Sequence, residues 1–105
     1  MITFLFNNEG THIANVVKGQ LYMPDGAHVG CYQEERGIFI DLAGHYLGEL
    51  LYDNRLLCNQ YSPYRHERYV PGDSYNELSN IGNYGDPGKE SSIGTIDGYE
   101  NVVLK

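Results

Sequence analysis

The segment YMPDGAHVGC, residues 22–31, carries the pattern that predicts the fold of this chain. An apolar and aromatic stretch meets a turn that ends at Gly26, and the aliphatic Val29 and the small Gly30 follow it. Pro-Asp-Gly suits a tight hairpin turn, because glycine adopts the positive φ that such turns require. The segment therefore predicts two short antiparallel strands joined by a turn.

The same pattern recurs on both sides of this segment, in FNNEGTHIAN (6–15) and IDLAGHYLGE (40–49). In each copy an aliphatic residue lies three positions after the turn glycine, and a small residue follows it. A repeated small residue indicates a place where backbones approach closely. In the two flanking copies the turn glycine, aliphatic residue and small residue are Gly10, Ile13 and Ala14, and Gly44, Leu47 and Gly48.

The spacing of the turn glycines predicts how the repeats divide the chain. Gly10, Gly26 and Gly44 are almost evenly spaced, whereas a far longer interval separates Gly44 from Gly98. The last interval is one repeat plus an extra block, and the repeat at Gly98 is degenerate. We expect a single domain over 1–105, with hairpins near 1–17, 18–34, 35–51 and 89–105 and an insertion at 52–88.

Short hairpins cannot each bury an apolar face alone, but several around a common axis can share one core. Closure of the ring also removes exposed strand edges. The predicted fold class is therefore mainly β, with four β-hairpin repeats around a pseudo-four-fold axis. The glycine turns and the run GNYGDPGKESSIG (82–94) resemble the small bacterial proteins of the four-fold β-flower family. That resemblance implies the fold and no activity.

The insertion at 52–88 differs in composition from the repeats. LLYDNRLLCN (50–59) predicts an extra hairpin or loop that turns at Asp53-Asn54. Ser74 and Glu77 form a capping box, and Gly82 suits a helix end, so we expect one short helix near 74–81.

The insertion also gathers the residues best suited to binding. It holds six of the ten tyrosines and three of the seven basic residues of the chain. Tyrosine offers a rigid face with a polar tip, and arginine offers a fork for carboxylate or phosphate. Packing of the tyrosines on the core, and pairing of the arginines with Glu67 or Asp73, remain the structural alternative. The candidate ligand-binding or partner-binding residues are Tyr61, Tyr64, Arg65, His66, Arg68 and Tyr69.

Metal binding and catalysis have weaker support in the sequence. His12 and His28 occupy equivalent repeat positions and are weak metal candidates, because the third and fourth repeats offer Tyr46 and Glu100 instead. No nucleophile elbow, phosphate-binding loop or paired metal motif is present in the sequence, so we predict no enzyme activity and no cofactor.

The charge balance restricts the classes of partner. Fourteen acidic and seven basic residues give a formal net charge of −7, which disfavours non-specific binding to nucleic acid or anionic membrane. The N-terminus lacks the basic region of a signal peptide, and no apolar run approaches the roughly 20 residues of a membrane span. We expect a cytoplasmic protein, with Cys31 and Cys58 as buried thiols unless the fold brings them together.

Three functions fit these observations. The first is a non-catalytic module that binds or sequesters a small anionic, nucleotide-like ligand through the insertion. The second is an acidic interaction protein, such as an inhibitor or immunity factor, that covers a basic surface. The third is a structural homo-oligomer, with a symmetric dimer as its simplest form.

Overall fold

The computed structural model describes residues 2–69 and 87–104. Within them the chain is all β, and one sheet contains every strand in sequential order. The strands are β1 (Ile2–Phe6), β2 (His12–Val17), β3 (Gln20–Tyr22), β4 (His28–Gln33), β5 (Ile38–Asp41), β6 (Tyr46–Leu51), β7 (Arg55–Asn59) and β8 (Tyr99–Asn101).

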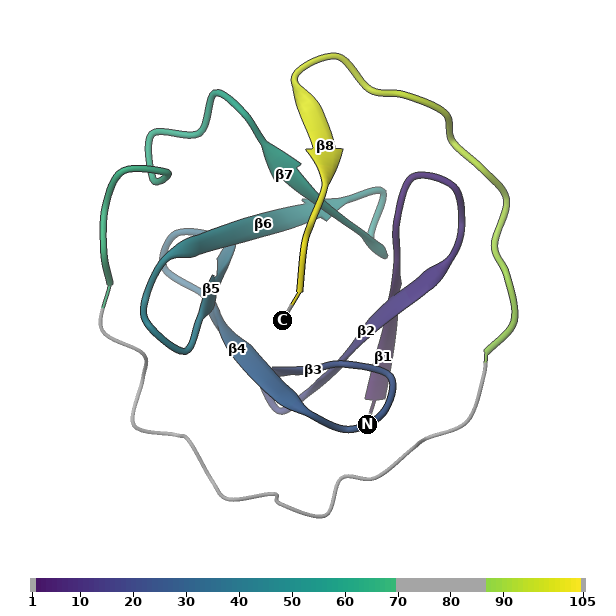
Figure 1. The fold of residues 1–105 in the computed structure, drawn as a ribbon, viewed down its shortest axis with the longest axis horizontal. Coiled ribbons are helices and arrows are strands. Elements are labelled where there is room, and N and C mark those ends of the chain that lie inside the picture. The colour runs from purple at the N-terminus through teal and green to yellow at the C-terminus, as the bar shows by residue number, and fades with distance from the viewer. Residues whose placement is uncertain (1, 70–86, 105) are drawn as a thin grey trace.

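The sheet closes on itself. Each neighbouring pair is antiparallel, and a parallel pairing of Phe6 with Arg55 joins β1 to β7. The seven strands β1 to β7 thus form a closed barrel, and β8 is an extra strand on β7. Figure 1 shows the strands as a ring, with the C-terminal residues after β8 running over its centre.

Three hairpins share one register, which explains the sequence repeat. In the first, Leu5 pairs with Ala14 and Phe6 pairs with His12, so Ile13 is left over as a bulge. The same register shift makes Val29 the bulged residue of the β3–β4 hairpin and Leu47 the bulged residue of the β5–β6 hairpin. All three bulged aliphatic residues pack into the main core cluster.

The small residue after the second and the third bulge lies against the neighbouring hairpin. A Cβ on Gly30 would overlap the carbonyl oxygen of Ile40. A Cβ on Gly48 would come within 2.6 Å of the Leu57 carbonyl oxygen and 2.9 Å of a Val102 methyl group. The expected close approach of backbones is confirmed at both glycines.

The fourth hairpin differs from the prediction in position, and its register differs from that of the other three, as expected of a degenerate repeat. β7 pairs with β8, and the regular pairing of Leu57 with Asn101 and Cys58 with Glu100 contains no bulge. Residues 87–98 contain no strand, so the hairpin expected near 89–105 is wrong in its first strand. β7 supplies that strand, and its Leu56 belongs to the main core cluster.

The pairing of β7 with β8 also changes the bounds of the insertion that was expected at 52–88. The turn predicted at Asp53-Asn54 is present, since β6 and β7 pair antiparallel and Leu51 lies opposite Arg55. It closes the barrel and does not belong to inserted material, so the long connection runs from residue 60 to residue 98, inside the fourth hairpin. The described parts contain no helix, and the helix expected near 74–81 lies outside the described residues.

The core fills the barrel and extends over part of its outer face. Inside lie the fully buried Leu5, Leu21, Phe39 and Leu56, with Ala14 and Val29. On the outer face, Cys31, Ile38 and Ile40 form a second cluster beneath aromatic rings. Cys31 is buried, Cys58 is half-buried, and both are free thiols.

Candidate functional site

The connection from β7 to β8 is held against the hairpin turns. The Gln60 amide donates to the Gly98 carbonyl at 2.8 Å, and the Tyr69 amide donates to the Gly44 carbonyl at 2.8 Å. Residues 60–69 are therefore fixed at both ends. Figure 1 shows this segment and residues 87–98 running around the outside of the ring on opposite sides.

Two of the candidate binding tyrosines cover the core. Tyr64 and Tyr69 pack on the outer cluster of Cys31, Ile38 and Ile40, and their rings meet edge to face with centroids 6.1 Å apart. The Arg36 guanidinium lies 4.2 Å above the Tyr69 ring, a cation–π geometry. These two tyrosines anchor the segment by burying apolar surface.

The two candidate arginines brace the backbone. Arg65 donates from Nη1 to the Gln60 carbonyl at 2.7 Å, and Arg68 donates from Nε to the Ala43 carbonyl at 2.8 Å. Both side chains are exposed, and neither forms an ion pair with Glu67. Since a guanidinium carries five N–H donors, each arginine retains donors for another group.

Tyr61 and His66 are the most open of the candidate residues. Tyr61 is 78% exposed, and the edge of its ring lies next to Gly98. His66 is exposed as well. These two side chains and the free ends of the arginines face solvent, whereas Tyr64 and Tyr69 face the protein.

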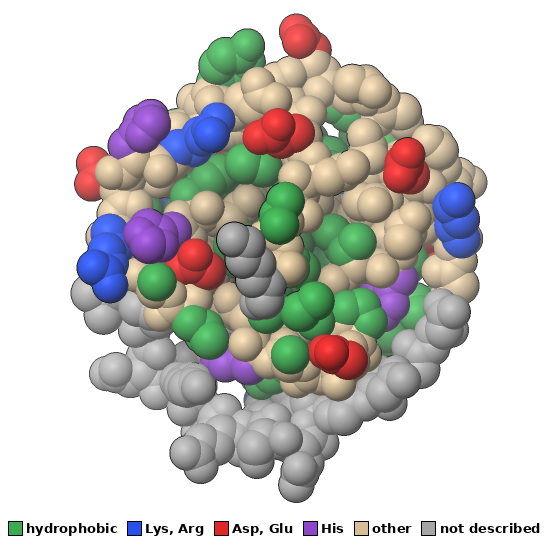
Figure 2. Space-filling view, in the orientation of Figure 1, with side chains coloured by type: hydrophobic (Ala, Val, Ile, Leu, Met, Phe, Trp, Pro, Cys, Tyr) green, Lys and Arg blue, Asp and Glu red, His purple; other side chains and the backbone are tan. Residues whose placement is uncertain are grey.

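The fold adds two basic side chains that sequence reasoning missed. His45 forms a β-bridge with Arg68, and Arg36 reaches Tyr69 from the turn after β4. We call Arg36, His45, Arg65, His66 and Arg68 the basic edge. Figure 2 shows blue and purple side chains gathered on the left of the molecule, where Figure 1 places this segment. No local signal links residues 36 and 45 to it, because only tertiary packing brings them together.

The histidines proposed as weak metal ligands form hydrogen bonds within their own hairpins. His12 Nε2 lies 3.1 Å from the Ala14 carbonyl oxygen, and His28 Nε2 lies 3.0 Å from the Gly30 carbonyl oxygen. Both rings must carry a proton on Nε2, because each partner is an acceptor. Residues 2–69 and 87–104 contain no group of His, Cys, Asp and Glu arranged to hold a metal.

A polar cluster between β6, β7 and β8 was also missed. The Tyr46 hydroxyl donates to Glu49 at 3.0 Å and accepts the Asn59 amide at 3.0 Å, while the Tyr99 hydroxyl reaches Glu49 at 3.5 Å. Burial raises the pKa of Tyr46 well above its usual 10, and the Glu49 carboxylate raises it further. Burial also raises the pKa of Cys58, which Arg65 partly offsets. The raised pKa values keep the Tyr46 hydroxyl and the Cys58 thiol neutral, which suits a structural role.

No helix in the described part of the chain is long and apolar enough to cross a membrane. Comparison with protein-family models, with curated proteins and with solved structures finds no match to this chain. Functional inference therefore depends on the geometry of the site.

Proposed function

We propose that this protein is a non-catalytic binding module that takes a small nucleotide-like anion on its basic edge. The scaffold is the set of hairpins arranged around a common axis, which holds residues 60–69 outside the barrel. Phosphate oxygens are bound by Arg65, His66 and Arg68, and the ring of the ligand stacks on Tyr61.

The observation that carries this proposal is that, among the described residues, each arginine side chain bonds to one backbone carbonyl and to no carboxylate. Each donates one hydrogen bond to a backbone carbonyl, at 2.7 Å for Arg65 and 2.8 Å for Arg68. A braced side chain loses little conformational freedom when it binds, so more of the interaction energy appears as affinity. The remaining N–H groups form no ion pair with a carboxylate among the described residues.

The acidic character of the chain makes the position of these groups informative. With a net charge of −7, most of the surface repels an anion, so binding depends on a local group of cations. At physiological salt the screening length is about 8 Å, so distant carboxylates oppose binding weakly, whereas Asp41 and Glu67 lie beside members of the basic edge. The exposed Tyr61 ring adds an aromatic face that a simple phosphate would not need.

Calorimetric titration with ATP, adenosine and inorganic tripolyphosphate tests the proposal. We expect ATP to bind more tightly than either fragment, and Arg68→Gln to weaken ATP binding about tenfold through loss of one charge-assisted bond. Tyr61→Ala should weaken ATP binding and leave tripolyphosphate binding unchanged.

Lys89→Gln is the matched control, because it removes one exposed positive charge from the opposite part of the connection. It should leave ATP affinity within about twofold of wild type, since distant surface charges are screened. If Lys89→Gln and Arg68→Gln weaken ATP binding equally, the loss of affinity reflects only the change in net charge. Absence of ATP binding by wild type would refute the proposal.

A further inference from the structure

A second candidate site lies beside the C-terminal residues, and no arginine and no tyrosine is among the described residues that line it. It is a cavity of about 350 Å³, a volume within the range of small-molecule sites. We call it the tail cavity. Its walls are six apolar residues and one carboxylate, from β4, β5, the β5–β6 turn, β6 and the C-terminal residues: Val29, Asp41, Leu42, Ala43, Leu47, Val103 and Leu104.

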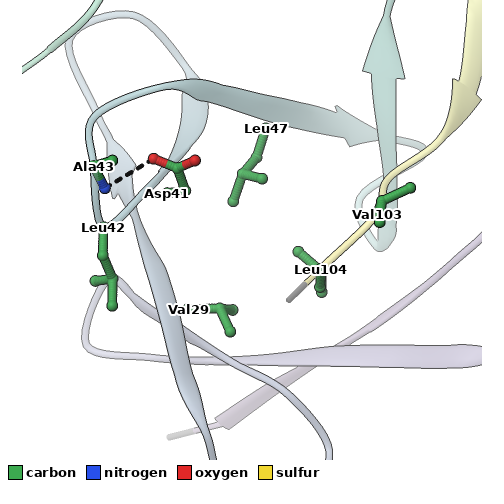
Figure 3. Close-up of a pocket in the computed structure, with 7 residues that line it drawn as sticks. All are labelled: Val29, Asp41, Leu42, Ala43, Leu47, Val103 and Leu104. Carbon is green, nitrogen blue, oxygen red and sulfur yellow. Dashed lines mark hydrogen bonds between the residues drawn. The ribbon is translucent and has the colours of Figure 1, made fainter.

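The carboxylate in the wall is Asp41, and its two oxygens have different roles. Oδ1 accepts the amides of Ala43 and His45, both at 2.9 Å, and so holds the β5–β6 turn. Figure 3 shows this oxygen toward Ala43 and the other oxygen turned toward Leu47, within the ring of lining side chains. Asp41 is the one carboxylate among the described residues that line the cavity, and Oδ2 is its oxygen that does not hold the turn.

The turn itself does not require a negative charge. In the first hairpin, Asn7 Oδ1 accepts the amides of Glu9 and Thr11, both at 2.9 Å, which is the same arrangement that Asp41 makes. A neutral amide therefore builds this turn equally well. The hydrogen bonds of the turn therefore do not account for the charge on Asp41.

The ion pair with His45 compensates the negative charge of Asp41 only in part. His45 Nδ1 lies 3.5 Å from Asp41 Oδ2, and the two side chains are 61% and 34% exposed. An exposed pair of this kind contributes about 0 to 1 kcal/mol. Arg68 does not neutralise Asp41 by an ion pair, because its Nε bonds to the Ala43 carbonyl.

We propose that the tail cavity binds a small apolar cation, with its hydrocarbon body among Val29, Leu47 and Leu104 and its ammonium group on Asp41 Oδ2. Aliphatic walls exclude water from the body of the ligand, and partial exclusion of water strengthens the attraction between ammonium and carboxylate. An anion or a doubly charged polar ligand would lose solvation in the same place without compensation. This site is separate from the phosphate-binding groups of the proposed function.

Three probes of similar shape test the proposal by NMR titration: phenethylammonium, phenethyl alcohol and phenylpropionate. We expect shifts at the amides of Val29, Leu47 and Leu104, and about fivefold tighter binding of the ammonium than of the alcohol. Phenylpropionate should bind most weakly. Equal binding of all three, or shifts confined to other residues, would overturn the proposal, as would no binding at millimolar concentration.

The decisive variant is Asp41→Asn, which keeps the turn as Asn7 does and removes the charge. It should abolish the preference for the ammonium over the alcohol while the amide spectrum stays folded. Asp25→Asn is the matched control, because Asp25 Oδ1 accepts the Ala27 amide in the β3–β4 turn and does not line the cavity. If Asp41→Asn retains the preference, or Asp25→Asn loses it equally, Asp41 is not the cation-binding group.

A second variant, Leu104→Ala, removes apolar wall without changing charge. It should weaken the ammonium and the alcohol by the same factor and leave their ratio unchanged. A changed ratio would show that Leu104 does not act as wall, and would count against the proposed position of the ligand.

Discussion

At the scale of single residues, equivalent positions in the repeat carry different side chains that all form hydrogen bonds. His12, His28 and Tyr46 each lie two residues after a turn glycine and opposite a residue of the first strand. The two histidines bond to carbonyl oxygens of their own strands, and His28 also bonds to Gln20 of β3. Tyr46 bonds to Glu49 of its own strand and to the Asn59 amide of β7. Spacing identified these positions as special, but only the direction of each side chain shows that they support the hairpins.

The Tyr46 hydroxyl should make stability sensitive to alkaline pH. Its pKa is raised in the folded protein, so the unfolded chain loses this proton near pH 10 while the folded chain keeps it. The stabilisation is complete below that pH and is lost as pH rises above it. Urea unfolding at pH 9, 10 and 11 should show a steeper fall in the free energy of unfolding for wild type than for Tyr46→Phe.

Tyr52→Phe provides the comparison, because the Tyr52 side chain is 67% exposed. It should follow the wild-type dependence on pH. If Tyr46→Phe also follows wild type, the buried hydroxyl does not contribute to the alkaline loss of stability.

At the scale of elements, the hairpin turns serve as docking points for the connection between β7 and β8. The Glu90 amide donates to the Gly10 carbonyl at 2.9 Å, and the Tyr69 amide donates to the Gly44 carbonyl at 2.8 Å. Both turn glycines lie so close to the connection that a Cβ would overlap a carbonyl oxygen, from Glu90 and Tyr69 respectively. The glycines that make the turns therefore also make room for the segments outside them.

Gly44→Ala should release residues 60–69 from the barrel. The added methyl group overlaps the Tyr69 carbonyl, and the backbone at φ +92° disfavours any side chain. Limited trypsin digestion followed by mass spectrometry should show faster cleavage after Arg65 and Arg68 than in wild type.

Gly19→Ala is the control that separates steric overlap with the connection from backbone strain at positive φ. Gly19 has a similar φ of +79° but nothing within 4 Å of an added Cβ. It should lower stability by about 1 kcal/mol through backbone strain and leave cleavage at the two arginines near the wild-type rate. Equal acceleration in both variants would show that general destabilisation, and not undocking, exposes the segment.

At the scale of the whole molecule, closure of the barrel depends on Arg55. This residue begins β7 opposite Phe6 of β1, and its side chain is only 6% exposed. The guanidinium donates to the Asn7 carbonyl at 3.1 Å, the Ser91 carbonyl at 2.7 Å and Asn54 Oδ1 at 3.3 Å. One side chain thus ties the first hairpin to the last and holds residues 87–98 against both.

Arg55→Met should lower the free energy of unfolding by about 2 to 3 kcal/mol, since charge-assisted bonds are lost and buried acceptors lose their donor. Urea denaturation followed by circular dichroism measures the change. Arg36→Met, at an exposed arginine stacked on Tyr69, should cost less than about 1 kcal/mol. Similar losses in the two variants would contradict a closing role for Arg55.

The sequence predicted the elements of the repeat better than their assembly. The turn glycine, the aliphatic residue and the small residue follow from local backbone chemistry, and three hairpins match that prediction at Ile13, Val29 and Leu47. The fourth hairpin was placed wrongly because the whole segment 60–98 separates its two strands, Arg55–Asn59 and Tyr99–Asn101, along the chain. Local patterns carry no information about so long a connection.

The sequence by itself determined the β class, the hairpin turns and the concentration of tyrosine and arginine after β7, because these depend on residue type and short spacing. Only the tertiary structure decided that β7 pairs with β8, that His45 and Arg36 join Arg65 and Arg68, and that Asp41 faces an apolar cavity. The physical reason is that side-chain direction and distant contacts are set by closing the sheet, and closure is a property of all its strands together.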